Sequence, residues 1–204
     1  MARIDDYLAA RKLAIEKLAA TPFEELLSRS GYISSSEMTF TIPFLNRTYN
    51  VTYPDFAFTD ADNKDREVPI QEQVLILHYL STENPPKPNG NWVAYREIPG
   101  AGFYFSAFVK RAIDPLKKTF GHQTKALESA AAQLTATPIE AGDAGFELFA
   151  MPLVPVQMII WEGDEEFEPE ANILFDQMIA KILSPEDIAW LAGMIVYRLM
   201  ALSH

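Results

Sequence analysis

The sequence contains no cysteine. This absence excludes disulfide bonds, iron–sulfur ligation by the chain itself, thiolate zinc sites and cysteine nucleophiles. Histidine is scarce as well, and His78, His122 and His204 lie too far apart in sequence to form the i, i+4 pair of a helical metal site. The sequence therefore predicts no metal site built on cysteine or histidine, and it names no cofactor.

Basic residues are also few, with 17 Lys and Arg against 28 Asp and Glu and a formal net charge of −11. A protein that binds nucleic acid or an anionic membrane surface needs clustered cations. The densest clusters here are only Lys110-Arg111 and Lys117-Lys118. We therefore expect no binding to nucleic acid or to membranes, and we interpret the acidic balance as a contribution to solubility.

Long apolar runs are missing. The most apolar stretch, 188–202, is about 15 residues long and contains Arg198, whereas a membrane span needs about 20 apolar residues. The N-terminal sequence, Met1 to Asp6, lacks the basic start and apolar run of a secretory signal. The sequence therefore predicts a cytoplasmic protein in which 188–202 is a buried central helix.

The composition that is present favours a large core. Hydrophobic residues make up 49% and aromatic residues 12% of 204 residues, which predicts a single domain over 1–204. Helical periodicity or capping signals predict helices at 3–19, 22–29, 69–80, 103–119, 122–134, 169–182 and 185–202.

Alternating or apolar runs predict strands within 37–59 and at 92–98, 146–151 and 154–161. Helices and strands do not alternate strictly. The predicted fold class is therefore α+β, with a mostly antiparallel sheet packed by several helices and the apolar C-terminal helix in the core.

The segment from Trp161 to Glu170 is the most unusual feature of the chain. It holds six carboxylates within nine residues, and Trp161 and Phe167 accompany them. One interpretation is an exposed corner whose acids precede the N-terminus of a helix. The other is a ligand pocket or a site for a hard cation, with Asp164, Glu165 and Glu166 as its best candidates.

A second candidate region follows the strand at 92–98. Arg96 stands near its end, and in so acidic a chain we expect it to pair with a carboxylate of the protein or of a ligand. Gly100 and Gly102 then allow close approach of a ligand to the backbone. On the helix expected at 169–182, Asn172 and Asp176 share one face, where they brace the structure or contact a ligand.

The serines lack the Gly-x-Ser-x-Gly elbow, and the sequence assigns no catalytic residue. The candidate ligand-binding residues are Arg96, Glu97, Tyr104, Trp161, Asp164, Glu165, Glu166, Asn172 and Asp176.

Two passages, Trp92–Tyr104 and Gly163–Leu199, resemble the family named domain of unknown function 3786, found in anaerobic bacteria and archaea. The family has no assigned activity. Some members resemble iron–sulfur proteins through an attached cysteine-rich segment, which implies corrinoid or redox metabolism. Because this chain has no cysteine, any cluster would come from an iron–sulfur or corrinoid partner protein.

The leading expectation is a domain that binds a small anionic ligand or metabolite, or an accessory domain, in anaerobic metabolism. For such a binding site to exist, Arg96 at the end of its strand and the acidic residues 164–166 must lie around the same cavity. The alternatives are an enzyme with a carboxylate general base at 164–166 and a non-catalytic structural or assembly subunit. The sequence leaves the oligomeric state and catalysis open.

Overall fold

The computed structural model describes residues 4–203 and divides into two compact units, Met1–Pro86 and Lys87–His204. The expected start of the first helix at residue 3 and the N-terminal residues 1–3 lie outside the described residues, as does residue 204. Each unit is described by itself. The interpretation of 1–204 as a single domain stays a prediction.

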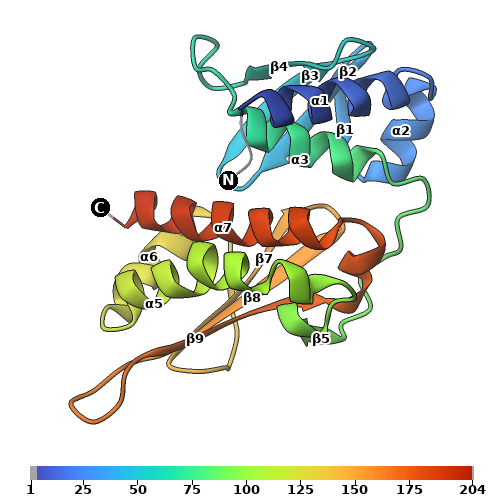
Figure 1. Cartoon of the computed structure of the whole chain (residues 1–204). Coiled ribbons are helices and arrows are strands. Elements are labelled where there is room, and N and C mark those ends of the chain that lie inside the picture. The colour runs from blue at the N-terminus through green and yellow to red at the C-terminus, as the bar shows by residue number, and fades with distance from the viewer. Residues whose placement is uncertain (1–3, 204) are drawn as a thin grey trace. The chain divides into compact units, whose positions relative to one another are not determined.

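The first unit combines three helices with an antiparallel sheet of four strands (Figure 1). The helices are α1 (Ile4–Leu18), α2 (Phe23–Ser30) and α3 (Ile70–Leu80). The strands are β1 (Ile33–Ser36), β2 (Thr39–Phe44), β3 (Arg47–Thr52) and β4 (Ala57–Asp60), in that order across the sheet. Alternation along β2 buries Phe40, Ile42 and Phe44, and α1 packs against α3.

A buried polar network lies inside this unit. The Tyr49 hydroxyl donates a hydrogen bond to the buried carboxylate of Glu72. The carboxylate of Asp60, only 1% exposed, accepts the backbone N–H groups of Asp62 and Asn63 and pairs with Arg66 over 3.2 Å. Buried charges that are paired and hydrogen-bonded in this way are tolerated inside a fold.

The second unit packs its helices on one face of a five-stranded antiparallel sheet, in the order β5-β9-β8-β7-β6 (Figure 1). The strands are β5 (Trp92–Ala94), β6 (Thr137–Pro138), β7 (Ala144–Met151), β8 (Val154–Trp161) and β9 (Glu170–Asp176). The helices are α4 (Phe105–Phe108), α5 (Asp114–Phe120), α6 (Thr124–Gln133) and α7 (Pro185–Leu202). Short helical turns are η1 (Tyr95–Glu97), η2 (Ala101–Phe103), η3 (Val109–Ile113) and η4 (Gln177–Lys181).

The predicted α+β class with antiparallel sheets is confirmed, and so is the buried C-terminal helix. Helix α7 begins at a capping box in which Ser184 and Asp187 exchange hydrogen bonds. Its side chains Ile188, Leu191 and Leu199 are fully buried. Every helix within residues 4–203 is too short or too polar to span a bilayer.

The prediction of a helix at 169–182 is wrong. Residues 170–176 form β9, paired along its length with β8, and only the turn η4 follows. Ile173 and Phe175 are buried at alternate positions, as expected for a strand. This alternation, together with pairing to β8, favours a strand over the helix that the sequence spacing suggested.

The helix predicted at 103–119 is interrupted. The π-helical turn η3 separates α4 from α5, and Pro115 lies in the first turn of α5. Proline has no backbone N–H to donate to the preceding turn, which accounts for a break in the α-helical pattern here. The helix predicted at 22–29 is present as α2, with Pro22 as its N-cap residue and no side-chain hydrogen bond at this cap.

Candidate functional site

The acidic segment forms the turn of the hairpin between β8 and β9. The last paired residues are Trp161 and Glu170, and the turn extends away from the helices (orange loop in Figure 1). The Asp164 carboxylate accepts the backbone N–H groups of Glu166 and Phe167, both at 2.8 Å. These two bonds lower the pKa of Asp164. Asp164 therefore shapes the turn.

Hydrogen bonds connect the start of this turn to the C-terminal end of α5. The Gly163 N–H donates to the Gly121 carbonyl over 2.9 Å, and Nδ1 of His122 donates to the Gly163 carbonyl over 3.1 Å. A Cβ added at Gly121 would lie 2.5 Å from the Pro169 side chain, and one at Gly163 2.6 Å from it. Both positions therefore need glycine if the β8–β9 turn is to approach the end of α5 this closely.

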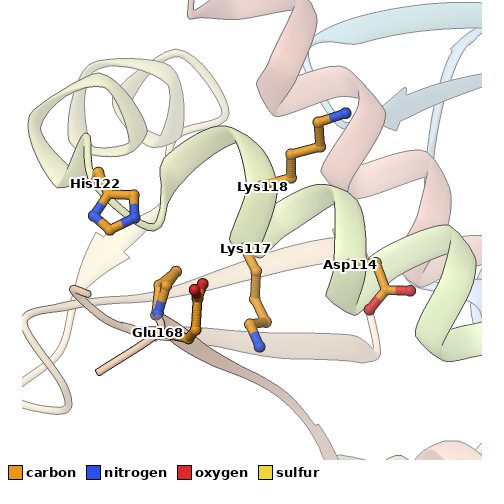
Figure 2. A pocket seen from close by; sticks show the side chains of 6 residues that line it. Asp114, Lys117, Lys118, His122 and Glu168 are labelled. Carbon is orange, nitrogen blue, oxygen red and sulfur yellow. The ribbon is translucent and has the colours of Figure 1, made fainter. Parts of the chain in front are cut away.

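This junction encloses one side of a surface hollow of about 390 Å³, here called the α5 hollow (Figure 2). Its lining combines cationic, imidazole and carboxylate side chains: Asp114, Lys117, Lys118, His122, Glu168 and Pro169. In Figure 2, Lys117 and Glu168 point to the same side of α5, whereas the Lys118 ammonium points away from them. The ends of Lys117 and Glu168 form no hydrogen bond or ion pair with any described residue.

His122 has a defined orientation at the edge of the α5 hollow. A carbonyl oxygen can only accept, so Nδ1 carries the hydrogen in the bond to Gly163. In the neutral ring, Nε2 is then left as an acceptor, and in the protonated ring it becomes a second donor. An imidazole anchored through Nδ1 in this way presents one nitrogen to a ligand.

The residues around Arg96 lie in a different place. Arg96 itself is exposed in η1, and its guanidinium lies 4.1 Å from the centre of the Phe105 ring. Glu97 accepts the backbone N–H of Ala94 over 2.7 Å. Tyr104 hydrogen-bonds Glu186 at the start of α7, and the negative charge of Glu186 raises the pKa of Tyr104.

The remaining candidates are spread along the hairpin. Trp161 is exposed at the end of β8, and Glu165 and Glu166 are exposed in the turn. Asn172 is half-buried in the middle of β9. Asp176 is buried at its end, where its carboxylate accepts the N–H groups of Asn89, Gly90 and Met178 and so braces the chain.

The structure therefore brings Trp161 and the acids 164–166 together on one hairpin, and Arg96, Glu97 and Tyr104 together near the start of α7. The α5 hollow contains neither Arg96 nor any of 164–166. Within residues 4–203, no group of three or more His, Cys, Asp or Glu side chains is arranged to hold a metal ion. A ligand-binding role for the nine candidates stays a prediction.

Sequence reasoning missed the α5 hollow, although it noted Lys117, Lys118 and His122 separately. Glu168 belongs to the acidic segment, but its proximity to α5 depends on a contact between Gly121 and Gly163, 42 positions apart. The signal in the sequence that could have indicated this contact was a glycine after each of the two elements, Gly121 after α5 and Gly163 after β8. Glycine at such positions is common at turns, so the signal did not specify a pairing.

The fold and these contacts define the class of the protein as antiparallel α+β, with a charged hollow between a helix end and a hairpin. The chain belongs to the family Domain of unknown function (DUF3786), whose sequence model matches residues 22–198. The match begins just before α2 and ends within α7, so it includes the α5 hollow. The comparisons with curated proteins and with solved structures gave no match.

Proposed function

We propose that this protein is a small-ligand-binding domain that takes an anionic metabolite in the α5 hollow. The observation that carries the proposal is that Lys117, His122 and Glu168 line one hollow of about 390 Å³ with their charged or polar ends available. That volume suits a small molecule, because ligand sites usually measure about 300–1,000 Å³.

The chemistry of the lining defines the ligand class. The Lys117 ammonium supplies a mobile cation for a carboxylate or phosphate group, and the free nitrogen of His122 adds a donor when the ring is protonated. Glu168 and Asp114 would accept hydrogen bonds from hydroxyl, amide or amine groups of the same molecule. We therefore expect a polar metabolite that has an anionic group and at least one donor.

The biological setting belongs to this proposal. The cytoplasmic location follows from the sequence features given above, and an anaerobic role beside an iron–sulfur or corrinoid partner protein is what the family resemblance implies. The absence of cysteine would leave any cluster on the partner. The alternative of a structural or assembly subunit predicts exposed aromatics at a partner surface. The exposed aromatics of the second unit come from several separate elements, which gives this alternative weaker support: Phe103, Phe149, Trp161, Phe167 and Tyr197.

A carboxylate general base at 164–166 is the enzyme alternative. Asp164 is engaged by two backbone N–H groups, and its lowered pKa makes it a weaker base. Glu165 and Glu166 are exposed on the turn. A base works best where water is excluded and a substrate is fixed beside it, so we favour binding over catalysis.

A titration with inorganic phosphate, followed by NMR shifts of backbone amides, tests the proposal. We expect shifts at Lys117, His122 and Gly163 and an affinity lowered about tenfold or more by Lys117→Glu, since a hydrogen bond to a charged group contributes about 1.5–3 kcal/mol. Lys87→Glu makes the same change of charge at an exposed residue outside the hollow and should leave the affinity unchanged. Equal weakening by both variants would show only a general charge effect and would contradict the proposal.

A further inference from the structure

A second hollow of about 390 Å³ lies at the edge of the five-stranded sheet in the same unit. It is here called the edge hollow, and it shares no lining residue with the α5 hollow. Its walls come from β5, from the turn that follows it and from η4. Val93, Ile98 and Met178 provide an apolar surface.

Hydrogen bonds hold the frame of the edge hollow. Asp176 accepts the N–H of Met178 at the start of η4 and, with its other oxygen, the N–H groups of Asn89 and Gly90 before β5. The Gln177 N–H donates to the Asn91 carbonyl over 2.8 Å. These bonds fix η4 against β5, so the walls are formed before any ligand arrives.

Two opposite charges line the edge hollow without neutralising each other. One oxygen of Glu97 accepts the Ala94 N–H, which fixes the carboxylate and leaves its second oxygen available. The Lys181 ammonium is exposed, and neither it nor Glu97 takes part in an ion pair within the described part of the chain. The edge hollow thus offers one carboxylate and one ammonium group, and a dipolar ligand satisfies both.

We infer that the edge hollow binds an apolar α-amino acid. The ammonium group of the ligand pairs with Glu97 and its carboxylate pairs with Lys181. The apolar side chain of the ligand packs against Ile98 and Met178, where its burial adds a hydrophobic contribution. This inference concerns a site separate from the one in the proposed function, and neither depends on the other.

Calorimetric titration of the full-length protein with L-leucine and L-phenylalanine tests the inference. The comparison compounds are 4-methylpentanoate, which is leucine without its ammonium group, and 3-methylbutylamine, which is leucine without its carboxylate. We expect both amino acids to bind, and leucine to bind about tenfold or more tightly than either comparison compound, because each comparison compound lacks one charge-assisted contact.

Two variants assign the contacts. Glu97→Gln keeps an acceptor for the Ala94 N–H but removes the charge, so it should weaken binding of the amino acid and of the amine. Lys181→Glu should weaken binding of the amino acid and of the pentanoate. Lys125→Glu, an exposed change of equal charge on α6, is the matched control and should have no effect.

The inference is overturned if neither amino acid binds, if leucine binds no more tightly than its two analogues, or if binding survives both Glu97→Gln and Lys181→Glu. Lys117→Glu reports on the α5 hollow alone. Loss of phosphate binding in that variant, with amino acid binding intact, would separate the two sites.

Discussion

At the scale of single residues, Tyr49 of the first unit allows a test in alkali. Its side chain is fully buried, and its hydroxyl donates to the Glu72 carboxylate. Burial and the negative charge of Glu72 raise the pKa of Tyr49 to about 12. In the unfolded chain the same hydroxyl titrates at about 10, so the folded state holds its proton more tightly than the unfolded state does.

This difference predicts a loss of stability in alkali. Because the folded pKa is the higher one, the contribution of Tyr49 is complete below about pH 10 and falls by up to about 1.4 kcal/mol per pH unit as the pH rises towards 12. Tyr49→Phe removes the titrating group but also a hydrogen bond to a buried carboxylate, at a cost of about 1–3 kcal/mol at pH 7.

Urea unfolding of the wild type and of Tyr49→Phe at pH 7 and pH 11 checks this prediction. The variant should be the less stable protein at pH 7, and the difference should shrink at pH 11. A difference of the same size at both pH values would contradict the assignment of a raised pKa to Tyr49.

At the scale of elements, the close contact between the end of α5 and the β8–β9 turn can be tested by substitution of Gly121. Gly121 has a φ of −63°, which any residue adopts, so Gly121→Ala costs energy only through contact of its new Cβ with Pro169 and with the Lys117 carbonyl, each at 2.5 Å. We expect a loss of about 1–3 kcal/mol in the free energy of unfolding, typical of overpacking.

Gly102→Ala is the matched control, because a Cβ at Gly102 would meet no atom within 4 Å. Chemical denaturation of the two variants measures the contrast. Should Gly121→Ala be as stable as Gly102→Ala, the turn would not be fastened to α5 in the way described.

The sequence predicted most elements but not all, and β9 shows why. The α7 helix was predicted with its correct bounds, because Ser184, Pro185 and Asp187 give a local start signal. For 170–176 the run Ala171 to Phe175 fits both a helix and a strand, and the choice depends on pairing with β8, which is not local.

The candidate site was less predictable than the fold. The sequence placed Arg96 near the end of a strand at 92–98, but β5 ends at Ala94 and Arg96 lies in the turn η1. Its guanidinium lies over the Phe105 ring, whereas the sequence led us to expect a carboxylate partner. Asp176 was expected either to brace the structure or to contact a ligand, and its three backbone hydrogen bonds agree with the bracing role. Side-chain partners of this kind come from turns whose geometry no periodic pattern encodes.

At the scale of the whole molecule, the prediction of a single domain can be tested by unfolding. The tryptophans Trp92, Trp161 and Trp190 all lie in the second unit, whereas both units contain helices. If the chain unfolds as one domain, tryptophan fluorescence and far-ultraviolet circular dichroism should give coincident thermal transitions. A dichroism transition with a second step that fluorescence does not follow would contradict the single domain.

The central claim concerns what the α5 hollow holds in the cell. Native mass spectrometry of the wild type and of Lys117→Glu, each expressed in the host organism and purified without exposure to air, tests it most directly. We predict that the wild type retains a small polar molecule that adds a defined mass, and that the variant lacks it. A wild type without added mass, or the same added mass on both proteins, would contradict the assignment of a ligand to this hollow.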